Sequence, residues 1–76
     1  MLSARLRVSA VYRGGSFERV IMALHRKRAV LSTLTAVSYS GVWTIDIEAS
    51  VPESRLEHVI QALAREPVVL DVRRVG

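Results

Sequence analysis

The sequence predicts an α+β protein with the element order βαββαβ, a ferredoxin-like fold with two helices on one face of a four-stranded antiparallel sheet. Four segments alternate apolar and polar residues, as strands with one solvated face do. Two further segments each carry one apolar stripe at positions i, i+3, i+4 and i+7, the spacing of an amphipathic helix. Right-handed crossovers between the strands then give the strand order 4-1-3-2.

The first strand is predicted over residues 4–12, where even-numbered apolar side chains share one face. Gly14 and Gly15 interrupt the alternation, and Ser16 is the expected N-cap of a helix that runs to about Arg28. The apolar stripe of this helix comprises Phe17, Val20, Ile21 and Leu24.

The second strand is predicted over residues 30–39, which are rich in β-branched side chains. Ser40 and Gly41 form the expected hairpin turn before a cleanly alternating third strand at 43–50, which Pro52 ends.

The second helix is expected to begin either at Glu53 or with a capping box made by Ser54 and Glu57. Its apolar stripe comprises Leu56, Val59, Ile60 and Leu63, and Pro67 is expected to end it. Residues 68–75 complete the sheet, and their expected buried side chains are Val68, Leu70 and Val72.

The chain is small, with 76 residues and no cysteine, so its own core is marginal and a partner is expected. The net charge of +4 lies entirely within residues 13–28, which hold five basic side chains and one acidic one. A basic protein can bind nucleic acid, but base stacking needs outward aromatic residues on the first and third strands. Tyr12 and Trp43 share the inward phase instead, so a base-stacking sheet is not expected.

No catalytic or metal-ligating constellation emerges from the sequence. It lacks cysteine and asparagine, and His25 and His58 are expected on helix surfaces without a nucleophile in reach. We therefore expect neither an enzyme nor a cofactor. Without a signal peptide or an apolar membrane span, the expected location is the cytoplasm.

Two short segments are candidate binding sites. Gly14, Gly15 and Ser16 could direct backbone N–H groups at a carboxylate beside the positive end of the helix dipole, or they could form a plain turn. Arg19, Met22 and Arg26 share a helix face opposite the apolar stripe. That face is either a contact for a protein partner or an ordinary basic surface with a single exposed Met.

The segment around the first helix resembles ACT domains, above all those in the small regulatory subunits of acetolactate synthase. The matching residues are Gly15-Ser16-Phe17-Glu18-Arg19-Val20-Ile21, then Leu24, Lys27 and Leu31-Ser32-Thr33-Leu34-Thr35. The strand at 43–49 and the closing residues Leu63, Pro67, Val68, Leu70, Asp71 and Val72 also fit the family. The resemblance covers nearly the whole chain and implies one ACT-type domain over residues 1–76, as in the short single-domain members.

This resemblance implies a non-catalytic subunit. Such subunits dimerise through the edge of the second strand and activate the large, thiamine-diphosphate-dependent subunit in branched-chain amino-acid biosynthesis. In many of them valine binds near the turn before the first helix, at the dimer interface, and inhibits. Two asparagines of the valine-sensing members are matched here by Tyr12 and Val30, and the glycine that ends their first helix is matched by Arg28. We therefore expect weak or absent valine feedback.

Two alternatives from other functional classes stay open. The chain could be a standalone ACT-type sensor that binds another amino acid and regulates a different enzyme. It could also be a basic ferredoxin-like module that binds nucleic acid through its charge, with binding that weakens steeply as salt rises.

Overall fold

The computed structural model describes residues 2–76, so Met1 of the predicted domain lies outside the described residues. The elements in chain order are β1 (Leu2–Val11), α1 (Ser16–Arg26), β2 (Val30–Tyr39), β3 (Val42–Val51), a 3-10 turn η1 (Glu53–Arg55), α2 (Leu56–Ala64) and β4 (Val69–Arg74). All strand pairs are antiparallel, in the order β2-β3-β1-β4. The predicted fold class and strand order are therefore confirmed.

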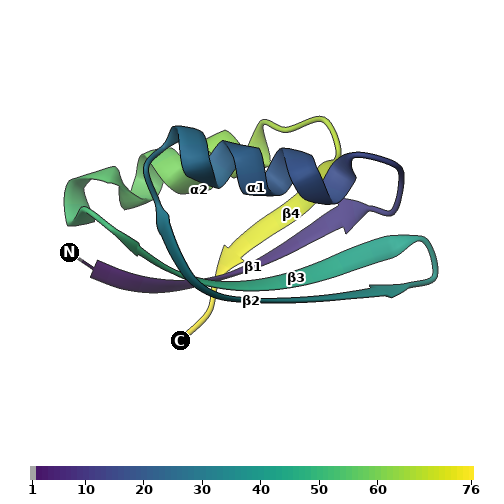
Figure 1. Ribbon diagram of the computed structural model, residues 1–76, viewed down its shortest axis with the longest axis horizontal. Helices are drawn as coiled ribbons and strands as arrows, with labels where there is room; N and C mark the ends of the chain where they lie inside the picture. Colours follow the sequence, from purple (N-terminus) through teal and green to yellow (C-terminus); the bar gives the residue numbers. More distant parts are fainter. Residues whose placement is uncertain (1) are drawn as a thin grey trace.

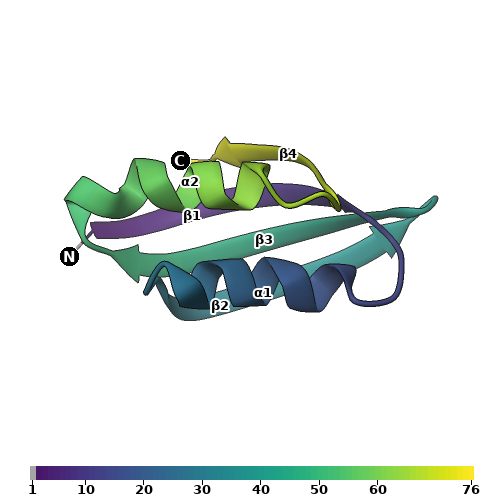
Figure 2. The ribbon, with the colours of Figure 1, turned by 90° about the horizontal axis from the view of Figure 1, so that it is seen from above.

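Both helices lie on the same side of the sheet (Figure 1), and they run side by side in opposite directions when viewed from above (Figure 2). Within residues 2–76 the other sheet face carries no helix, and we call it the open face. The two layers meet in a core formed by the inward side chains of the predicted strands and by the apolar stripes of the two predicted helices. Its fully buried side chains include Val8, Ile45, Val20, Val59 and Leu63.

The predicted hairpin turn is confirmed, since Ser40 and Gly41 have φ values of 52° and 81°. Two consecutive left-handed residues are what a tight two-residue hairpin turn requires. The turn lets β2 and β3 pair over their whole length, from Val30 with Ser50 to Tyr39 with Val42. In Figure 1 this hairpin reaches past the start of α1.

The start of α1 differs from the prediction. Gly15 occupies the N-cap position with φ 84°, and no side chain caps the helix. Ser16 is already helical, its side chain is 0% exposed, and its hydroxyl has no hydrogen-bond partner among the described residues. The prediction of Ser16 as N-cap is wrong because the left-handed turn falls on Gly15, which turns the Ser16 side chain inward.

The end of α1 comes two residues before the predicted Arg28. Lys27 is the C-cap, and Arg28 is left-handed with φ 61°. The N–H of Ala29 donates to the carbonyl of Leu24 at 3.1 Å, and the N–H of Arg28 donates to that of His25 at 3.0 Å. These two bonds form a Schellman motif, in which glycine normally holds the left-handed position.

The second helix also begins without the predicted capping box. A 3-10 turn over Glu53–Arg55 precedes it, α2 starts at Leu56, and neither element has a side-chain cap. The prediction that the element begins at Glu53 fits this turn. The helix ends at Ala64, before Pro67, and the N–H groups of Arg65 and Glu66 donate to the carbonyls of Gln61 and Leu63 in its last turn.

One predicted core residue of β4 is wrong. Leu70 is 59% exposed, whereas Val68 is buried and Val72 is half-buried. The register explains the difference, since Ser9 pairs with Asp71 while the next residue, Ala10, pairs with Val69. Leu70 is thus the extra residue of a β-bulge, which breaks the period-two alternation and brings Val69 rather than Leu70 against the core.

Candidate functional site

The turn between β1 and α1 is fixed by backbone hydrogen bonds. The N–H of Ser16 donates to the carbonyl of Arg13 at 3.1 Å, and the N–H of Arg19 donates to that of Gly15 at 3.0 Å. The N–H of Tyr12 donates to the carbonyl of Gly41 at 2.9 Å, which ties this turn to the β2–β3 hairpin. The turn is therefore held between the start of α1 and the tip of the sheet.

Beside this turn lies a hollow of about 410 Å³, which we call the aromatic hollow. Three aromatic side chains line it, from the residue after β1, the first turn of α1 and the start of β3. The Trp43 ring centroid lies 5.1 Å from that of Tyr12 and 5.7 Å from that of Phe17, with both ring pairs tilted by 44°. The complete lining is Tyr12, Arg13, Gly14, Gly15, Phe17, Glu18, Ala36 and Trp43.

The structure places two of the three predicted effector residues in this lining, Gly14 and Gly15. Ser16 is not among them, because its side chain is buried and its N–H is bonded to Arg13. Sequence reasoning missed Phe17 and Trp43 as site residues. A signal for Trp43 was present in the sequence, since Tyr12 and Trp43 share the inward phase at the same end of neighbouring strands.

The three residues predicted to contact a partner lie on one surface of α1. Arg19, Met22 and Arg26 line a hollow of about 380 Å³ on α1, and Met22 is 58% exposed between the two arginines. Glu66 completes this surface, which we call the arginine face. The Glu66 carboxylate accepts a hydrogen bond of 2.9 Å from Arg26 and lies 4.0 Å from Arg19. The predicted basic helix is thus partly neutralised by a residue that no local pattern could place there.

The outer edge of β2 is unusually apolar. Residues 30–39 contain no charged side chain, and Val30, Leu31, Val37 and Tyr39 are all exposed. Between this edge and α1 lies an apolar hollow of about 470 Å³, lined by Ile21, Leu24, His25, Arg28, Ala29, Val30 and Leu31. The opposite edge, β4, is shorter, bulged, and carries Asp71, Arg73 and Arg74. Short length, a bulge and charged side chains protect natural edge strands from pairing with another strand. The β4 edge has all three features, whereas β2 is longer and carries no charged side chain, so β2 is the unprotected edge.

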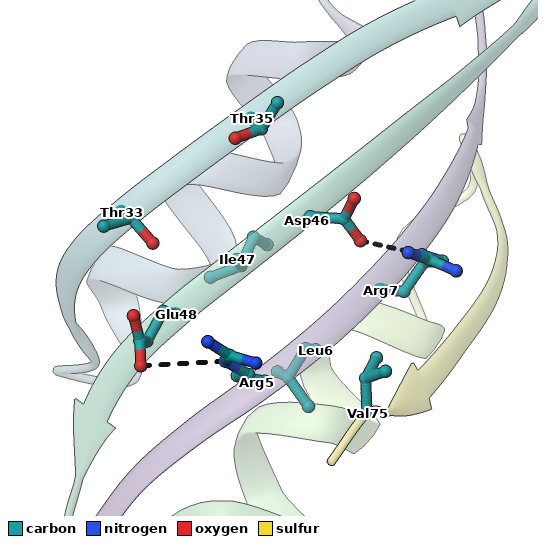
Figure 3. Close-up of a pocket in the computed structure, with 9 residues that line it drawn as sticks. All are labelled: Arg5, Leu6, Arg7, Thr33, Thr35, Asp46, Ile47, Glu48 and Val75. Carbon is teal, nitrogen blue, oxygen red and sulfur yellow. Dashed lines mark hydrogen bonds and ion pairs between the residues drawn. The ribbon is translucent and has the colours of Figure 1, made fainter.

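The open face of the sheet carries paired charges (Figure 3). Arg7 donates a hydrogen bond of 2.7 Å to Asp46, and the Arg5 guanidinium lies 3.8 Å from the Glu48 carboxylate. The hydrogen bond from Arg7 and the charge of Asp46 raise the pKa of Arg7 above its ordinary value. Thr33, Thr35 and Val75 complete a shallow hollow of about 230 Å³ there. Because the charges balance, this face offers no basic track for a polyanion.

Other kinds of site are not apparent in residues 2–76. No group of three His, Cys, Asp or Glu side chains in that range is placed to hold a metal ion. His25 and His58 are both exposed, as expected. None of the helices described is both long enough and apolar enough to cross a membrane.

The fold defines the class of protein before any relative is considered: an α+β module with two helices on one face of a four-stranded antiparallel sheet that has two open edges. The sequence itself matches no family model and no curated protein. Solved structures, in contrast, match over nearly the whole chain.

Three of the similar solved structures illustrate the result. The ACT domain of GTP pyrophosphokinase from Chlorobium tepidum matches with a TM-score of 0.84 and 15% identity, over 97% of each chain. The acetolactate synthase small subunit from Thermotoga maritima matches with a TM-score of 0.87 and 13% identity, over 100% of this chain and 48% of that one. A formyltetrahydrofolate deformylase from Pseudomonas putida KT2440 matches with a TM-score of 0.81 and 15% identity, over 99% and 29%.

The chain therefore has the fold of an ACT domain, and the resemblance inferred from its sequence is confirmed at the level of the fold. It spans about half the length of the Thermotoga small subunit and almost all of the Chlorobium ACT domain.

Proposed function

We propose that this chain is a non-catalytic regulatory subunit that dimerises through the edge of β2 and activates a thiamine-diphosphate-dependent acetolactate synthase large subunit. It would act in branched-chain amino-acid biosynthesis, in the cytoplasm, as a single ACT-type domain. The observation that carries the proposal is the match of the whole chain to the Thermotoga small subunit, together with the residues around α1 that resemble the same family.

The β2 edge supports the dimer. Two copies related by a two-fold axis would pair their β2 strands and cover the apolar hollow beside Leu31 and Ile21. Both the unpaired backbone groups of β2 and its exposed apolar side chains would leave water. A small core that needs a partner gains stability in this way.

The arginine face supports contact with the large subunit. Glu66 holds Arg19 and Arg26 on either side of the exposed Met22, which combines an apolar centre with polar flanks. Protein interfaces favour that arrangement, with Met and Arg both enriched. Acidic side chains on the large subunit would complement the two guanidinium groups.

The test is acetolactate formation by the purified large subunit of the same organism, with and without this chain. We expect activation by the native chain and its loss in the double variant Arg19→Glu, Met22→Ala. The control is Arg55→Glu, Leu70→Ala, which alters an exposed arginine and an exposed apolar residue away from α1. Activation by the first variant, or equal loss in both, would contradict the assignment of the arginine face.

Of the expected effector residues Gly14, Gly15 and Ser16, the proposal retains a site at Gly14 and Gly15, with little or no response to valine. Tyr12 replaces the polar side chain that the valine-sensing members present there. Tight binding of valine to the isolated chain in calorimetry would oppose this part of the proposal.

A second candidate is a standalone ACT-type sensor for a different enzyme. It is favoured by the match to the Chlorobium ACT domain, which belongs to a GTP pyrophosphokinase and is covered over 97% of its length. If the chain binds an amino acid but leaves the acetolactate synthase large subunit unaffected, this candidate replaces the first.

A further inference from the structure

The apolar hollow lies at the C-terminal end of α1, beside the start of β2. In Figure 2 α1 lies above the β2 side of the sheet, so the end of this helix and the edge of the sheet border the same space. The volume of about 470 Å³ is within the range of small-molecule sites. The turn with Gly14 and Gly15 lies at the other end of α1, and the apolar hollow shares no residue with the aromatic hollow there.

The wall of the apolar hollow combines buried and exposed aliphatic side chains. Leu24 and Ala29 belong to the core, and the N–H of Ala29 donates to the carbonyl of Leu24 at 3.1 Å, which fixes the two residues relative to each other. Val30 and Leu31 are instead 59% and 41% exposed. An aliphatic group that enters the hollow would therefore cover apolar side chains that contact water in the free chain.

The rim of the apolar hollow carries positive charge only. Its polar side chains are those of His25 and Arg28, and none of the lining residues is acidic. Neither of the two forms an ion pair within residues 2–76, whereas Arg7 and Arg26 both do. An aliphatic wall beside an unpaired guanidinium suits an aliphatic carboxylate, because the hydrocarbon chain leaves water and the charge gains a partner.

The dipole of α1 does not cancel this positive charge. The C-terminal end of a helix carries a partial negative charge of about half an elementary charge. Here the carbonyls of Ala23, Leu24 and His25 already accept hydrogen bonds from backbone N–H groups that follow the helix. The segment 25–28 holds three permanent cations and one histidine, and Glu66 pairs with only one of those cations, Arg26. The excess charge at this end of α1 is therefore positive.

The backbone of Arg28 indicates that its side chain has a use. Arg28 is left-handed with φ 61°, at the position of the Schellman motif where glycine is normally found. A residue with a Cβ atom is strained there, and strained backbone concentrates at functional sites. No ion pair of the guanidinium within residues 2–76 offsets that strain. A bound carboxylate would supply the missing partner.

We propose that the apolar hollow binds an aliphatic monocarboxylate that carries no ammonium group. The hydrocarbon chain of the ligand packs on Leu24, Ala29 and Leu31, and its carboxylate pairs with Arg28. An α-amino acid binds less well at this place because its ammonium group would lie among like charges. One chain is sufficient to form the site, which goes beyond the proposed function.

The test is an NMR titration of the isotope-labelled native chain, which reports binding residue by residue. The main probe is isohexanoate. L-leucine adds an ammonium group to it, isopentylamine has no carboxylate, and acetate has almost no hydrocarbon chain. We expect saturable shifts at Ala29 and Leu31 with isohexanoate, while the amides of Gly14 and Gly15 do not move. Binding of each of the other three probes should be about tenfold weaker or worse.

Arg28→Gly is the decisive variant, because it removes the guanidinium while glycine suits the left-handed backbone. It should bind isohexanoate about tenfold more weakly although the chain is at least as stable as the native one. Arg28→Lys retains the charge and should keep part of the binding. The control is Arg65→Gln, which alters an exposed arginine at the end of α2 and should leave binding unchanged.

A second pair of variants tests the apolar wall. Ile21→Ala removes aliphatic surface from the hollow and should weaken isohexanoate binding about threefold. Val37→Ala makes a comparable change on β2 outside the hollow and should have no effect. Equal loss in both variants would contradict the assignment of the wall.

One consequence rests on the proposed function, since pairing of two β2 edges would cover the same hollow. The ligand and a second copy would both contact Ile21 and Leu31, so they compete, and isohexanoate should shift a dimer toward monomer in sedimentation velocity. A dimer that persists at saturating isohexanoate would overturn the competition. A chain that is monomeric without ligand would contradict the proposed dimer and leave the NMR test of the site unaffected.

The remaining outcomes decide the site itself. Equal or tighter binding of L-leucine would overturn the ligand class. Shifts confined to the surroundings of Gly14 and Gly15 would overturn the location, and undiminished binding in Arg28→Gly would overturn the role of its charge. Absence of any shift with isohexanoate would overturn the inference entirely, while activation of the large subunit is decided by its separate assay.

Discussion

Glu66 accepts a hydrogen bond of 2.9 Å from the guanidinium of Arg26, although the two residues are 40 positions apart in the chain. Arg26 ends α1, and Glu66 lies in the connection between α2 and β4. The Glu66 side chain is only 14% exposed, and Arg19 approaches the same carboxylate to 4.0 Å. One acidic group thus links the two helical segments and orders the arginine face.

Replacing Glu66 with Gln should lower the free energy of unfolding by about 0.5–1 kcal/mol, the upper part of the range for surface ion pairs, because Glu66 is mostly buried while its arginine partners are exposed. The loss should shrink in high salt, because salt screens the pair. Urea unfolding at low and high ionic strength measures both effects. Glu57→Gln is the matched control, since Glu57 is exposed and forms no ion pair among residues 2–76. Equal destabilisation in the control would show that the pair contributes nothing specific.

Arg28→Gly should raise the free energy of unfolding by about 1 kcal/mol. Arg28 holds the left-handed position of the Schellman motif at φ 61°, a conformation that is strained for every residue with a Cβ atom except in special contexts. Arg65→Gly is the control at the end of α2. Arg65 is right-handed with φ −84°, so glycine there should lower stability instead. Thermal unfolding of both variants gives the sign, and a loss of stability in Arg28→Gly would contradict the assignment.

Ser16→Ala should raise the free energy of unfolding by about 0.5–1 kcal/mol, because it removes a buried hydroxyl without a partner among the described residues. The opposite sign follows if Ser16 caps the helix, since loss of an N-cap side chain typically destabilises by about 1 kcal/mol. The sign of the change in chemical unfolding therefore distinguishes a buried, unpaired Ser16 hydroxyl from a Ser16 side chain that caps the helix. Ser54→Ala, at the other expected cap, should change little because η1 has no side-chain cap.

Leu31→Lys should shift the protein from dimer to monomer if β2 is the paired edge. A lysine there would lie in the apolar hollow between β2 and α1, where its charge would lose water on dimerisation. Leu70→Lys places the same change on the exposed residue of the β4 edge and should leave the dimer intact. Sedimentation velocity over a concentration series measures the distribution. A dimer that survives Leu31→Lys but not Leu70→Lys would move the interface to β4.

Much of the fold followed from local periodicity. The alternation of apolar and polar residues predicted the inward faces of β1 and β3, which include Leu6 and Ile47. The apolar stripes predicted the buried sides of α1 and α2. The errors fall where periodicity stops. Leu70 is exposed because one inserted residue in β4 reverses the phase, and alternation alone contains no sign of it. Ser16 is buried because the left-handed turn lies at Gly15, and only the backbone angles decide which residue caps.

For the candidate site, too, local spacing predicted some residues, while contacts between distant residues were not predicted. The sequence placed Gly14 and Gly15 before a helix, and it placed Arg19, Met22 and Arg26 on one helix face, because both follow from spacing along the chain. It could not place Glu66 beside those arginines, nor gather Tyr12, Phe17 and Trp43 around one hollow.

By itself, then, the sequence determined the element order, the buried faces of β1, β3 and the two helices, and the absence of charge along β2, since these depend on residues close together in the chain. Only the tertiary structure decided which charges find partners and which stay unpaired, and where aromatic side chains meet. The aromatic contacts depend on how the residue after β1, the first turn of α1 and the start of β3 lie together, and the pair of Arg26 with Glu66 depends on how α1 lies beside α2. These positions are set by packing of the helices on the sheet, which no short stretch of residues specifies.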